Sequence, residues 1–380
     1  MKEYSPNIIA QVKVCGNEHT YCGHPVYAGE IFYFGNNEIA FMHTHTDDVN
    51  YNDAYLGHGQ LGVHAKAKVL LTRSYDGGMT WKEEDKSVVF DWGAPVEEQE
   101  ALLANEFTEE TMPPVTDQTL FHWGVSFCGP YYSDGVRRAL QPFMVRSDDK
   151  GHTWSEKTAI PFPMGSYMQP SSGPCVRQGN RWLKPFQVST VPETDNVSPE
   201  ANYRSVLYAS ENNGVTWQYV SDIARDIAGE IRYAYAVVVD LGQRHLLGTT
   251  GNWWGPDQRT RWISVCHSYD NGLNWTEPKR IQSFGVSPYT LRLRDGRVLM
   301  IYARRIPASL RGIYGMISED EGHTWSNEFA LRKGASSIEL GYPVAVETED
   351  NRIFTGYYYT VEEGLPNGGA RHIAGTIFTI

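Results

Sequence analysis

Short apolar segments separated by turn residues run along the whole chain. KVLLTRS at 68–74, RWISVCHS at 261–268 and GIYGMIS at 312–318 are typical of them. Segments of this length favour strands, and helical periodicity is hard to find anywhere in the sequence. The pattern therefore predicts an all-β protein built from many short strands.

One turn sequence follows five of these segments, with the frame Ser-x-Asp/Asn-x-Gly-x-Thr/Asn-Trp. The copies are SYDGGMTW at 74–81, SDDKGHTW at 147–154, SENNGVTW at 210–217, SYDNGLNW at 268–275 and SEDEGHTW at 318–325. The Asp or Asn can cap its own turn, the Gly accepts positive φ, and the Trp anchors the turn to the core. The copies start 50 to 73 residues apart, a spacing typical of one four-stranded propeller blade with its loops.

A second repeated unit lies upstream of most of these turns. It consists of an X-Pro start, an apolar strand, a turn and another apolar strand. The copies are HPVYAGEIFYFGNNEIAFMH from His24, QPSSGPCVRQGNRWLKPFQ from Gln169, SPYTLRLRDGRVLMIYA from Ser287 and YPVAVETEDNRIFTGYY from Tyr342. We interpret them as paired inner strands of separate blades.

The last of these units has no Trp turn after it, and the chain ends at HIAGTIFTI. We expect the N-terminal strand near NIIAQVKV to complete a sixth blade, because such closure removes exposed sheet edges. The predicted fold is a six-bladed β-propeller with five such turns, forming a single domain over residues 1–380.

Composition excludes several classes of partner. Asp and Glu number 45 against 33 Lys and Arg, with no basic block, so neither nucleic acid nor a membrane surface is expected as a partner. No segment has the length of a signal peptide or a membrane span, which favours a cytoplasmic protein. The five cysteines are scattered without CxxC spacing; we expect free thiols, no metal site and no cofactor.

The five Trp turns resemble the Asp-boxes, or BNR repeats, of the sialidase (neuraminidase) superfamily. The resemblance runs from His24 to about Tyr359. It implies a six-bladed β-propeller and suggests a glycosidase with a glycoside or oligosaccharide substrate. In that family the Asp-boxes lie away from the active site, so the Asp-box carboxylates are interpreted as structural. They belong to Asp76, Asp149, Asp270 and Asp320.

Ligands of propellers usually bind where strand ends from several blades meet. The X-Pro positions mark inner-strand starts, and the return strands end some 16 to 20 residues later. The starts are His24, Gln169, Ser287 and Tyr342, and the ends lie near His43 and His45, Gln187, Arg304 and Arg305, and Tyr357 to Tyr359. Such a polar and aromatic ring suits a sugar, and we expect Gln169 and Tyr358 to bind substrate.

The segment MHTHTDD at 42–48 offers candidate proton-transfer groups. Strand alternation places His43 and His45 on one face, with Asp47 and Asp48 in the loop that follows. Both residue types can serve as general acids or bases near neutral pH. A metal site of two His and a carboxylate, or a polar loop with incidental His, are the alternatives.

Tyr342 is placed as the nucleophilic tyrosine of sialidases would be, with Glu339 shortly before it in ELGYPVAV. A packed aromatic residue is the alternative. Glu230 begins the inner strand of the fourth blade together with Arg232. It could activate a tyrosine or form a structural ion pair with the arginine.

The remaining candidates would bind the substrate. Arg304 could hold a carboxylate bidentately, or form a salt bridge between blades. Trp253 could stack on a sugar ring, or pack in the core. Arg232 and Arg371 are further candidates for contact with an acidic group.

The sequence departs from the sialidase pattern on the first blade. Gly23-His24-Pro25 stands where sialidases carry the first substrate-binding arginine of an Arg-Ile-Pro motif. Three hypotheses follow. The first is an exo-acting glycoside hydrolase on an acidic or deoxy sugar, and the second is a His-dependent rhamnosidase or uronate-specific polysaccharide lyase that uses His24, His43 or His45. The third is a propeller that binds glycans without catalysis.

Overall fold

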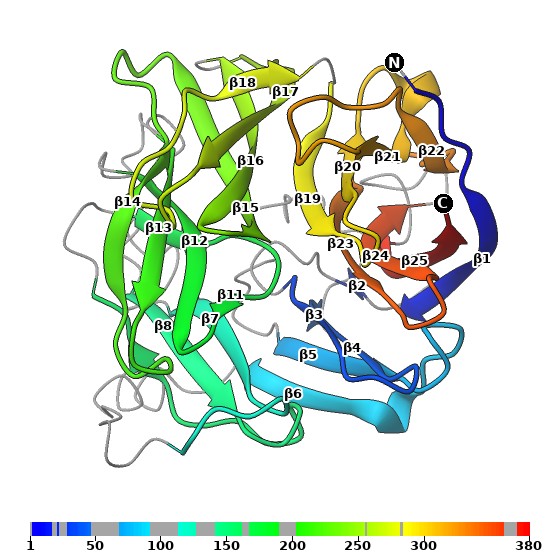
Figure 1. The fold of residues 1–380 in the computed structure, drawn as a ribbon. Coiled ribbons are helices and arrows are strands. Elements are labelled where there is room, and N and C mark those ends of the chain that lie inside the picture. Colours follow the sequence, from blue (N-terminus) through cyan, green and yellow to red (C-terminus); the bar gives the residue numbers. More distant parts are fainter. Residues whose placement is uncertain are drawn as a thin grey trace, which may run out of the picture. The chain divides into compact units, whose positions relative to one another are not determined.

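The computed structural model describes residues 2–16, 21–22, 29–46, 68–91, 113–126, 141–161, 167–189, 203–254, 257–281, 284–360 and 371–380. Within these ranges the regular structure is almost entirely strand, arranged in six sheets (Figure 1). The helices there are two 3₁₀ turns, η1 (Glu83–Asp85) and η3 (Ala308–Leu310). Neither is long or apolar enough to cross a membrane, and the described ranges contain no helix that could do so.

Three sheets belong to a compact unit made of residues 1–93 and 284–380. The first sheet contains β2 (Tyr21–Cys22), β3 (Ile31–Tyr33), β4 (Ile39–Thr46), β5 (Lys68–Ser74) and β6 (Lys86–Asp91). The fifth contains β19 (Val286–Arg292), β20 (Val298–Arg304), β21 (Gly312–Ser318) and β22 (Phe329–Lys333). The sixth contains β23 (Gly341–Glu347), β24 (Ile353–Thr360), β25 (Arg371–Thr379) and β1 (Asn7–Cys15).

The other three sheets belong to a unit made of residues 94–283. The second sheet contains β7 (Leu120–Ser126), β8 (Gln141–Ser147) and β9 (Thr158–Ala159). The third contains β10 (Tyr167–Pro170), β11 (Val176–Gln178), β12 (Arg181–Ser189), β13 (Arg204–Ser210) and β14 (Gln218–Ala224). The fourth contains β15 (Ile231–Gly242), β16 (His245–Trp254), β17 (Asp257–Ser268) and β18 (Lys279–Ile281).

The N-terminal strand closes the last sheet. β1 pairs antiparallel with β25, from Asn7 opposite Thr379 to Cys15 opposite Ile373. The chain therefore forms the predicted all-β fold, a six-bladed β-propeller, and its sixth blade takes strands from both ends of the sequence.

Each Trp turn is held by its own side chains. In the turn after β21, Ser318 Oγ donates to Asp320 Oδ1 over 2.8 Å and accepts from Gly322 N over 2.8 Å. Asp320 in turn accepts from the backbone N and hydroxyl of Thr324, and Trp325 Nε1 donates to Gly322 O. The same serine and Asp/Asn bonds recur in the turns after β5, β8, β13 and β17.

Hydrogen bonds keep the turn carboxylates ionised. Burial alone would raise the pKa of Asp149, but bonds from the Thr153 hydroxyl and backbone N–H lower it to about 2. For Asp270 the side chain of Asn274 is the main cause, and the pKa is again about 2. Carboxylates tied down in this way are poor proton donors near neutral pH, which supports their structural interpretation.

The glycines of three turns pack against the preceding sheet of their own unit. A Cβ on Gly78, whose φ is +91°, would lie 2.3 Å from Phe354 Cδ2 of β24. One on Gly214 would lie 2.5 Å from Phe121, and one on Gly272 would lie 2.4 Å from Leu207. These positions therefore need glycine for space as well as for backbone conformation.

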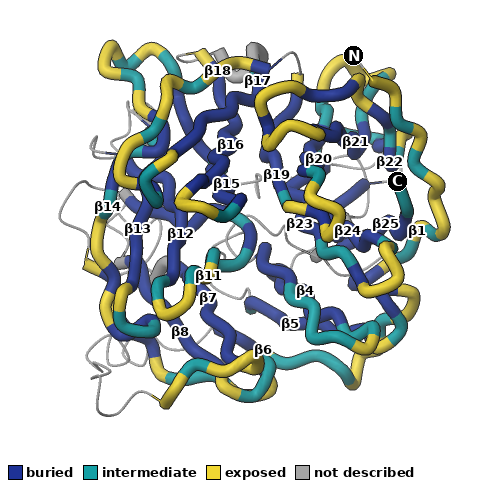
Figure 2. Tube along the Cα trace, viewed as in Figure 1, coloured by how far each residue is buried: buried dark blue, intermediate teal, exposed yellow. Residues whose placement is uncertain are grey.

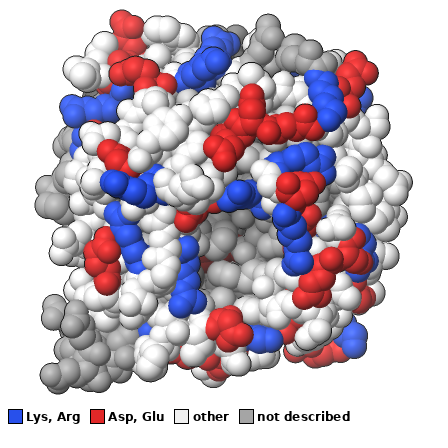
Figure 3. Space-filling model, in the orientation of Figure 1, with Lys and Arg blue, Asp and Glu red and all other residues white. Residues whose placement is uncertain are grey.

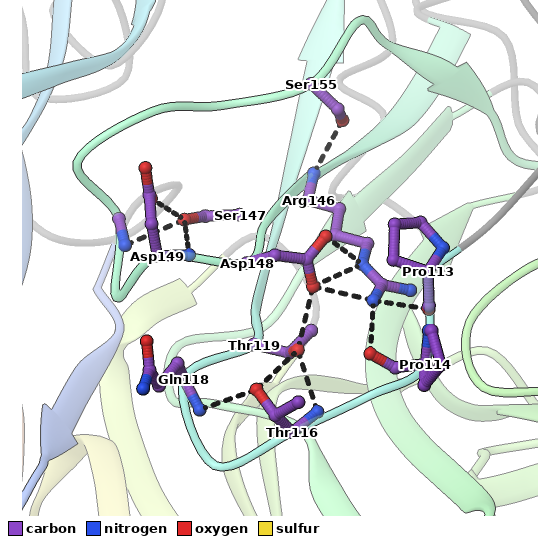
Figure 4. Close-up of polar contacts among 11 residues, drawn as sticks. Pro113, Pro114, Thr116, Gln118, Thr119, Arg146, Ser147, Asp148, Asp149 and Ser155 are labelled. Atoms are coloured by element: carbon purple, nitrogen blue, oxygen red, sulfur yellow. Dashed lines mark hydrogen bonds and ion pairs between the residues drawn. The ribbon is translucent and has the colours of Figure 1, made fainter.

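The turn after β8 also fixes the segment that precedes β7 (Figure 4). Asp148 accepts from Arg146 Nε over 2.9 Å and from the Thr119 hydroxyl over 2.8 Å. The Arg146 guanidinium, whose side chain is 2 % exposed, also donates to the carbonyl oxygens of Pro113 and Pro114. This arginine is consequently paired and structural.

Most strands are buried and most of the turns are exposed, while the outer strand β1 is largely exposed (Figure 2). Phe121 and Trp123 both pack edge to face on Trp217, between the second and third sheets. Leu207 and Leu246 belong to a second cluster that joins the third and fourth sheets. The apolar faces of neighbouring blades therefore form the core, and the turn tryptophan Trp217 is part of it.

Charged side chains of both signs are interspersed on the face shown in Figure 3. This mixture agrees with the excess of only twelve negative charges in the sequence. Cys15, Cys175 and Cys266 are free thiols, in line with the expectation for those three positions.

Candidate active site

Inner-strand starts oppose return-strand ends in three of the sheets for which the sequence predicted it, and the fourth sheet has an equivalent pair; the start at His24 lies outside the described residues. The opposed residues are Gln169 with Gln187, Arg232 with Trp253, Val286 with Ala303, and Gly341 with Tyr358. In the third, fourth and fifth sheets the Trp turn follows the third strand, so antiparallel pairing puts these residues at the other end of each of those sheets. The candidate residues therefore lie away from the Asp-boxes.

The innermost strands β15, β19 and β23 share a left-handed residue at this end. Tyr235, Ser287 and Tyr342 have φ values of 55°, 50° and 48°, and each lies at a break in the pairing register. A non-glycine residue in this conformation costs on the order of 1–3 kcal/mol, and such strain clusters at functional sites. Proline follows Ser287 and Tyr342, so the X-Pro signal found them, whereas Ala236 follows Tyr235 and left no signal.

Tyr342 lies in a buried group of two phenols and a guanidinium. Its side chain is 3 % exposed, and its ring stacks on that of Tyr358 with centroids 5.8 Å apart. The Arg305 guanidinium carbon is 5.5 Å from the Tyr342 ring centroid, and its Nη2 donates to Tyr358 Oη over 3.0 Å. Arg305 Nε also donates to Leu340 O, which fixes the guanidinium beside both phenols. Such a cation can stabilise negative charge on a phenol oxygen or attract an anionic substrate group.

Arg304, the predicted carboxylate clamp, has a different environment from Arg305. Its Nη1 donates to Glu328 Oε1 over 2.6 Å, and Glu328 Oε2 accepts from Tyr302 Oη over 2.8 Å. Burial, followed by the charge of Glu328, raises the pKa of the neighbouring Tyr314. Arg304 is thus neutralised within the fifth blade. Its salt bridge joins the end of β20 to the residue just before β22 of the same sheet, and not two blades, as the alternative had supposed. The arginine beside Tyr342 is the next residue, Arg305.

Gln169 and Gln187 form an amide pair in the other unit. Gln187 Nε2 donates to Gln169 Oε1 over 2.5 Å, and Gln187 Oε1 accepts from Tyr235 N over 3.2 Å. Both glutamines are at least 97 % buried. The pair therefore fixes the left-handed residue of β15 against the third sheet.

Trp253 packs in the core rather than at the surface, since its side chain is only 2 % exposed. It lies against Tyr203 and Tyr235, with Arg261 stacked 4.8 Å from its ring centroid. Trp254, by contrast, is 45 % exposed. Of this adjacent pair, Trp254 is the better placed to meet a sugar.

Glu230 occupies an exposed turn position. Asp226 organises this turn by accepting from the backbone N of Glu230 and of Ile231, both over 2.7 Å. Burial, followed by the charge of Asp226, raises the pKa of Tyr233 to about 12. Arg232 donates to Gly229 O, so this end of β15 is held largely by backbone contacts.

His43 is completely buried in the first sheet. Its Nδ1 is 3.1 Å from Thr44 O and its Nε2 is 2.8 Å from Thr72 Oγ1, which engages both ring nitrogens. His45, on the same strand, is half-buried, and its Nδ1 is 3.9 Å from Cys15 Sγ. The contacts of His43 suit a structural role, and His45 is the more accessible of the two.

Several predicted residues can be placed only in part. His24, Asp47 and Asp48 lie outside the described residues, and Arg371 is described only as the start of β25 opposite Thr360. Glu339 is half-buried, with its backbone N bonded to Ser337 Oγ. Within the described ranges, no three His, Cys, Asp or Glu side chains are grouped as a metal site would need.

A family match gives the class of protein to which this fold belongs. The BNR repeat-like domain family matches residues 114–359, and the chain belongs to this family. No curated protein matches the chain in sequence.

Solved structures share the fold at low sequence identity. A protein of unknown function from Dyadobacter fermentans is 20 % identical, with a TM-score of 0.74 and 99 % of both chains covered. The α-L-arabinofuranosidase Arb93A from Fusarium graminearum is 14 % identical, with a TM-score of 0.62 and 98 % of both chains covered. The NanB sialidase from Streptococcus pneumoniae is 11 % identical, with a TM-score of 0.59, over 100 % of this chain and 71 % of its own. This similarity establishes the propeller fold, which these two glycosidases share.

Proposed function

We propose that the chain is a carbohydrate-active enzyme, an exo-acting glycoside hydrolase on an acidic or deoxy sugar. The observation that carries the proposal is the group of Tyr342, Tyr358 and Arg305 at a strained strand start. The fold similarity to an arabinofuranosidase and a sialidase supports the glycoside as the substrate class.

In the proposed reaction, the phenol of Tyr342 gives its proton to a carboxylate, for which Glu339 is the sequence candidate, as its oxygen attacks the anomeric carbon of the sugar. The bond from that carbon to the leaving oxygen breaks, and the leaving oxygen takes a proton from an acid, for which Asp47 and Asp48 are the sequence candidates. Water then attacks the anomeric carbon and gives a proton to the ionised acid, while the glycosyl–tyrosine bond breaks and the phenol regains its proton from the carboxyl group that took it. Arg305 would stabilise negative charge on the phenol oxygens.

The guanidinium beside Tyr342 also fits an acidic sugar, because arginine can bind a substrate carboxylate through two parallel hydrogen bonds. Arg305 would supply this contact, since Arg304 is paired with Glu328.

The test is a turnover screen on aryl sialosides, α-L-rhamnosides, α-L-arabinofuranosides and glucuronides with the full chain. Tyr342→Phe should lower kcat by at least about a thousandfold, because it removes the nucleophile. Tyr357→Phe is the matched control, since this buried phenol shares a 2.6 Å hydrogen bond with Thr376 Oγ1. It should leave turnover within about twofold while lowering the free energy of unfolding by about 1 kcal/mol.

Three results would contradict the proposal. Hydrolysis that survives Tyr342→Phe but fails in His45→Ala would favour a His-dependent glycosidase. New ultraviolet absorption from an unsaturated uronyl product would show a lyase. Glycan binding without turnover on any substrate would show a non-catalytic propeller.

A further inference from the structure

A groove lies beside the Trp turn of the third sheet, at the end opposite the strand-end residues of that unit. Its volume is about 570 Å³, which is within the range of small-molecule sites. Arg181, Glu211, Gln218, Tyr219 and Leu273 are among the residues that line it. The groove therefore combines an aromatic ring, an aliphatic side chain and several planar polar groups.

Tyr219 supplies an aromatic surface with a fixed orientation. Its ring packs edge to face on Tyr208 with centroids 6.2 Å apart, and its hydroxyl donates to Asp222 Oδ1 over 3.3 Å. The side chain nevertheless remains 38 % exposed. Leu273, from the turn of the fourth sheet, is 55 % exposed on the groove lining. Two large apolar side chains thus border the same polar groove.

Arg181 and Glu211 form an ion pair in the polar lining of the groove, so their charges cancel. Arg181 Nε donates to Glu211 Oε1 over 2.7 Å, and Arg181 Nη1 donates to Asn271 O over 2.9 Å. These contacts hold the guanidinium and the carboxylate in place, and Gln218 adds an exposed amide. The lining therefore offers oriented donors and acceptors to an uncharged ligand.

We propose that this groove is a second carbohydrate site, which binds a neutral oligosaccharide. A sugar ring would stack on Tyr219, and its hydroxyls would bond Arg181, Glu211 and Gln218. An aromatic face beside planar polar groups suits a ligand whose rings have apolar faces and hydroxyl edges. An acidic ligand is disfavoured because Glu211 already compensates Arg181. None of the residues that line the groove is among the proposed catalytic residues, so the proposal does not depend on their chemistry.

The experiment is a binding titration by calorimetry of the full chain with neutral oligosaccharides derived from arabinan, xylan and mannan. Tyr219→Ala should weaken binding about tenfold, while Tyr219→Phe should retain it. Tyr269→Ala is the matched control, since this tyrosine of the fourth-sheet turn is 56 % exposed and does not line the groove. It should bind as the parent protein does.

Leu273→Arg provides a second variant if Tyr219→Ala fails to fold. The exposed position tolerates the change, and the longer side chain should obstruct the groove and abolish binding. The proposal is overturned if no neutral oligosaccharide binds, if binding persists in Tyr219→Ala and in Leu273→Arg, or if acidic oligosaccharides bind more tightly. Calorimetry measures binding and does not require turnover. A protein that binds the oligosaccharide but hydrolyses no glycoside would therefore refute the proposed hydrolase and not this binding site. Aryl glycoside turnover, if present, should be unchanged in Tyr219→Ala.

Discussion

Replacing Gly78 with alanine tests whether the Trp turns also serve as contacts between sheets. The φ of +91° would strain any L-residue by about 1–2 kcal/mol. The new Cβ would also meet Phe354 Cδ2 at 2.3 Å. Phe354 cannot easily move, because Phe41 and Trp81 pack on it with centroids 6.5 and 5.2 Å away. Overpacking of this kind costs about 1–3 kcal/mol, so the sum is about 2–5 kcal/mol.

Gly296 provides a control with the same backbone strain. Its φ is also +91°, but no atom lies within 4 Å of a Cβ added there. Gly296→Ala should therefore cost only the strain, about 1–2 kcal/mol. Urea unfolding followed by tryptophan fluorescence would measure both variants. Equal losses of stability would refute the close-contact argument, and a Phe354→Leu change that failed to relieve Gly78→Ala would refute it independently.

Three further changes probe the turns and the core. Ser318→Ala should lower the free energy of unfolding by about 1–3 kcal/mol in urea titrations, because Asp320 and the Gly322 N–H both lose a partner. An unchanged midpoint would contradict this. Asp149 has a pKa of about 2 in the fold against 3.8 normally, so its contribution to stability is complete above about pH 4 and declines as pH falls toward 2. Asp149→Asn should remove that part of the acid loss, as circular dichroism across this range would show. Burial raises the pKa of Cys266 to about 12. Iodoacetamide at about pH 8 should therefore label Cys266 only after unfolding, as mass spectrometry can check.

The fold could be predicted because its signals are local and repeated. The Ser-x-Asp/Asn-x-Gly turn depends on side chains within eight residues, and these form the same bonds in the turn of Ser147 as in that of Ser318. The closing strand β1 was inferred from a missing partner at the end of the chain, and it pairs with β25. What the pattern could not reveal was why Gly78 must be glycine, since Phe354 is distant in sequence.

The site was less predictable because burial depends on neighbouring sheets. Strand position could not show which of Arg304 and Arg305 lies beside Tyr342. The contacts place Arg304 against Glu328 and Arg305 against Tyr342 and Tyr358. Likewise, Trp253 is buried under Tyr203 while Trp254 is exposed. The X-Pro rule found Tyr342 because a proline follows it. It could not find the equivalent Tyr235, because Ala236 follows that residue.

The shared sixth sheet has a consequence for synthesis on the ribosome. Residues 94–283 form one contiguous unit, whereas the other unit is split between residues 1–93 and 284–380. The contiguous unit can therefore fold as it emerges, while β1 must wait for β25 at the far end of the chain. Until then β1 is an unpaired edge, open to pairing with other nascent chains. The sixth sheet can thus be completed only after β25 has been synthesised.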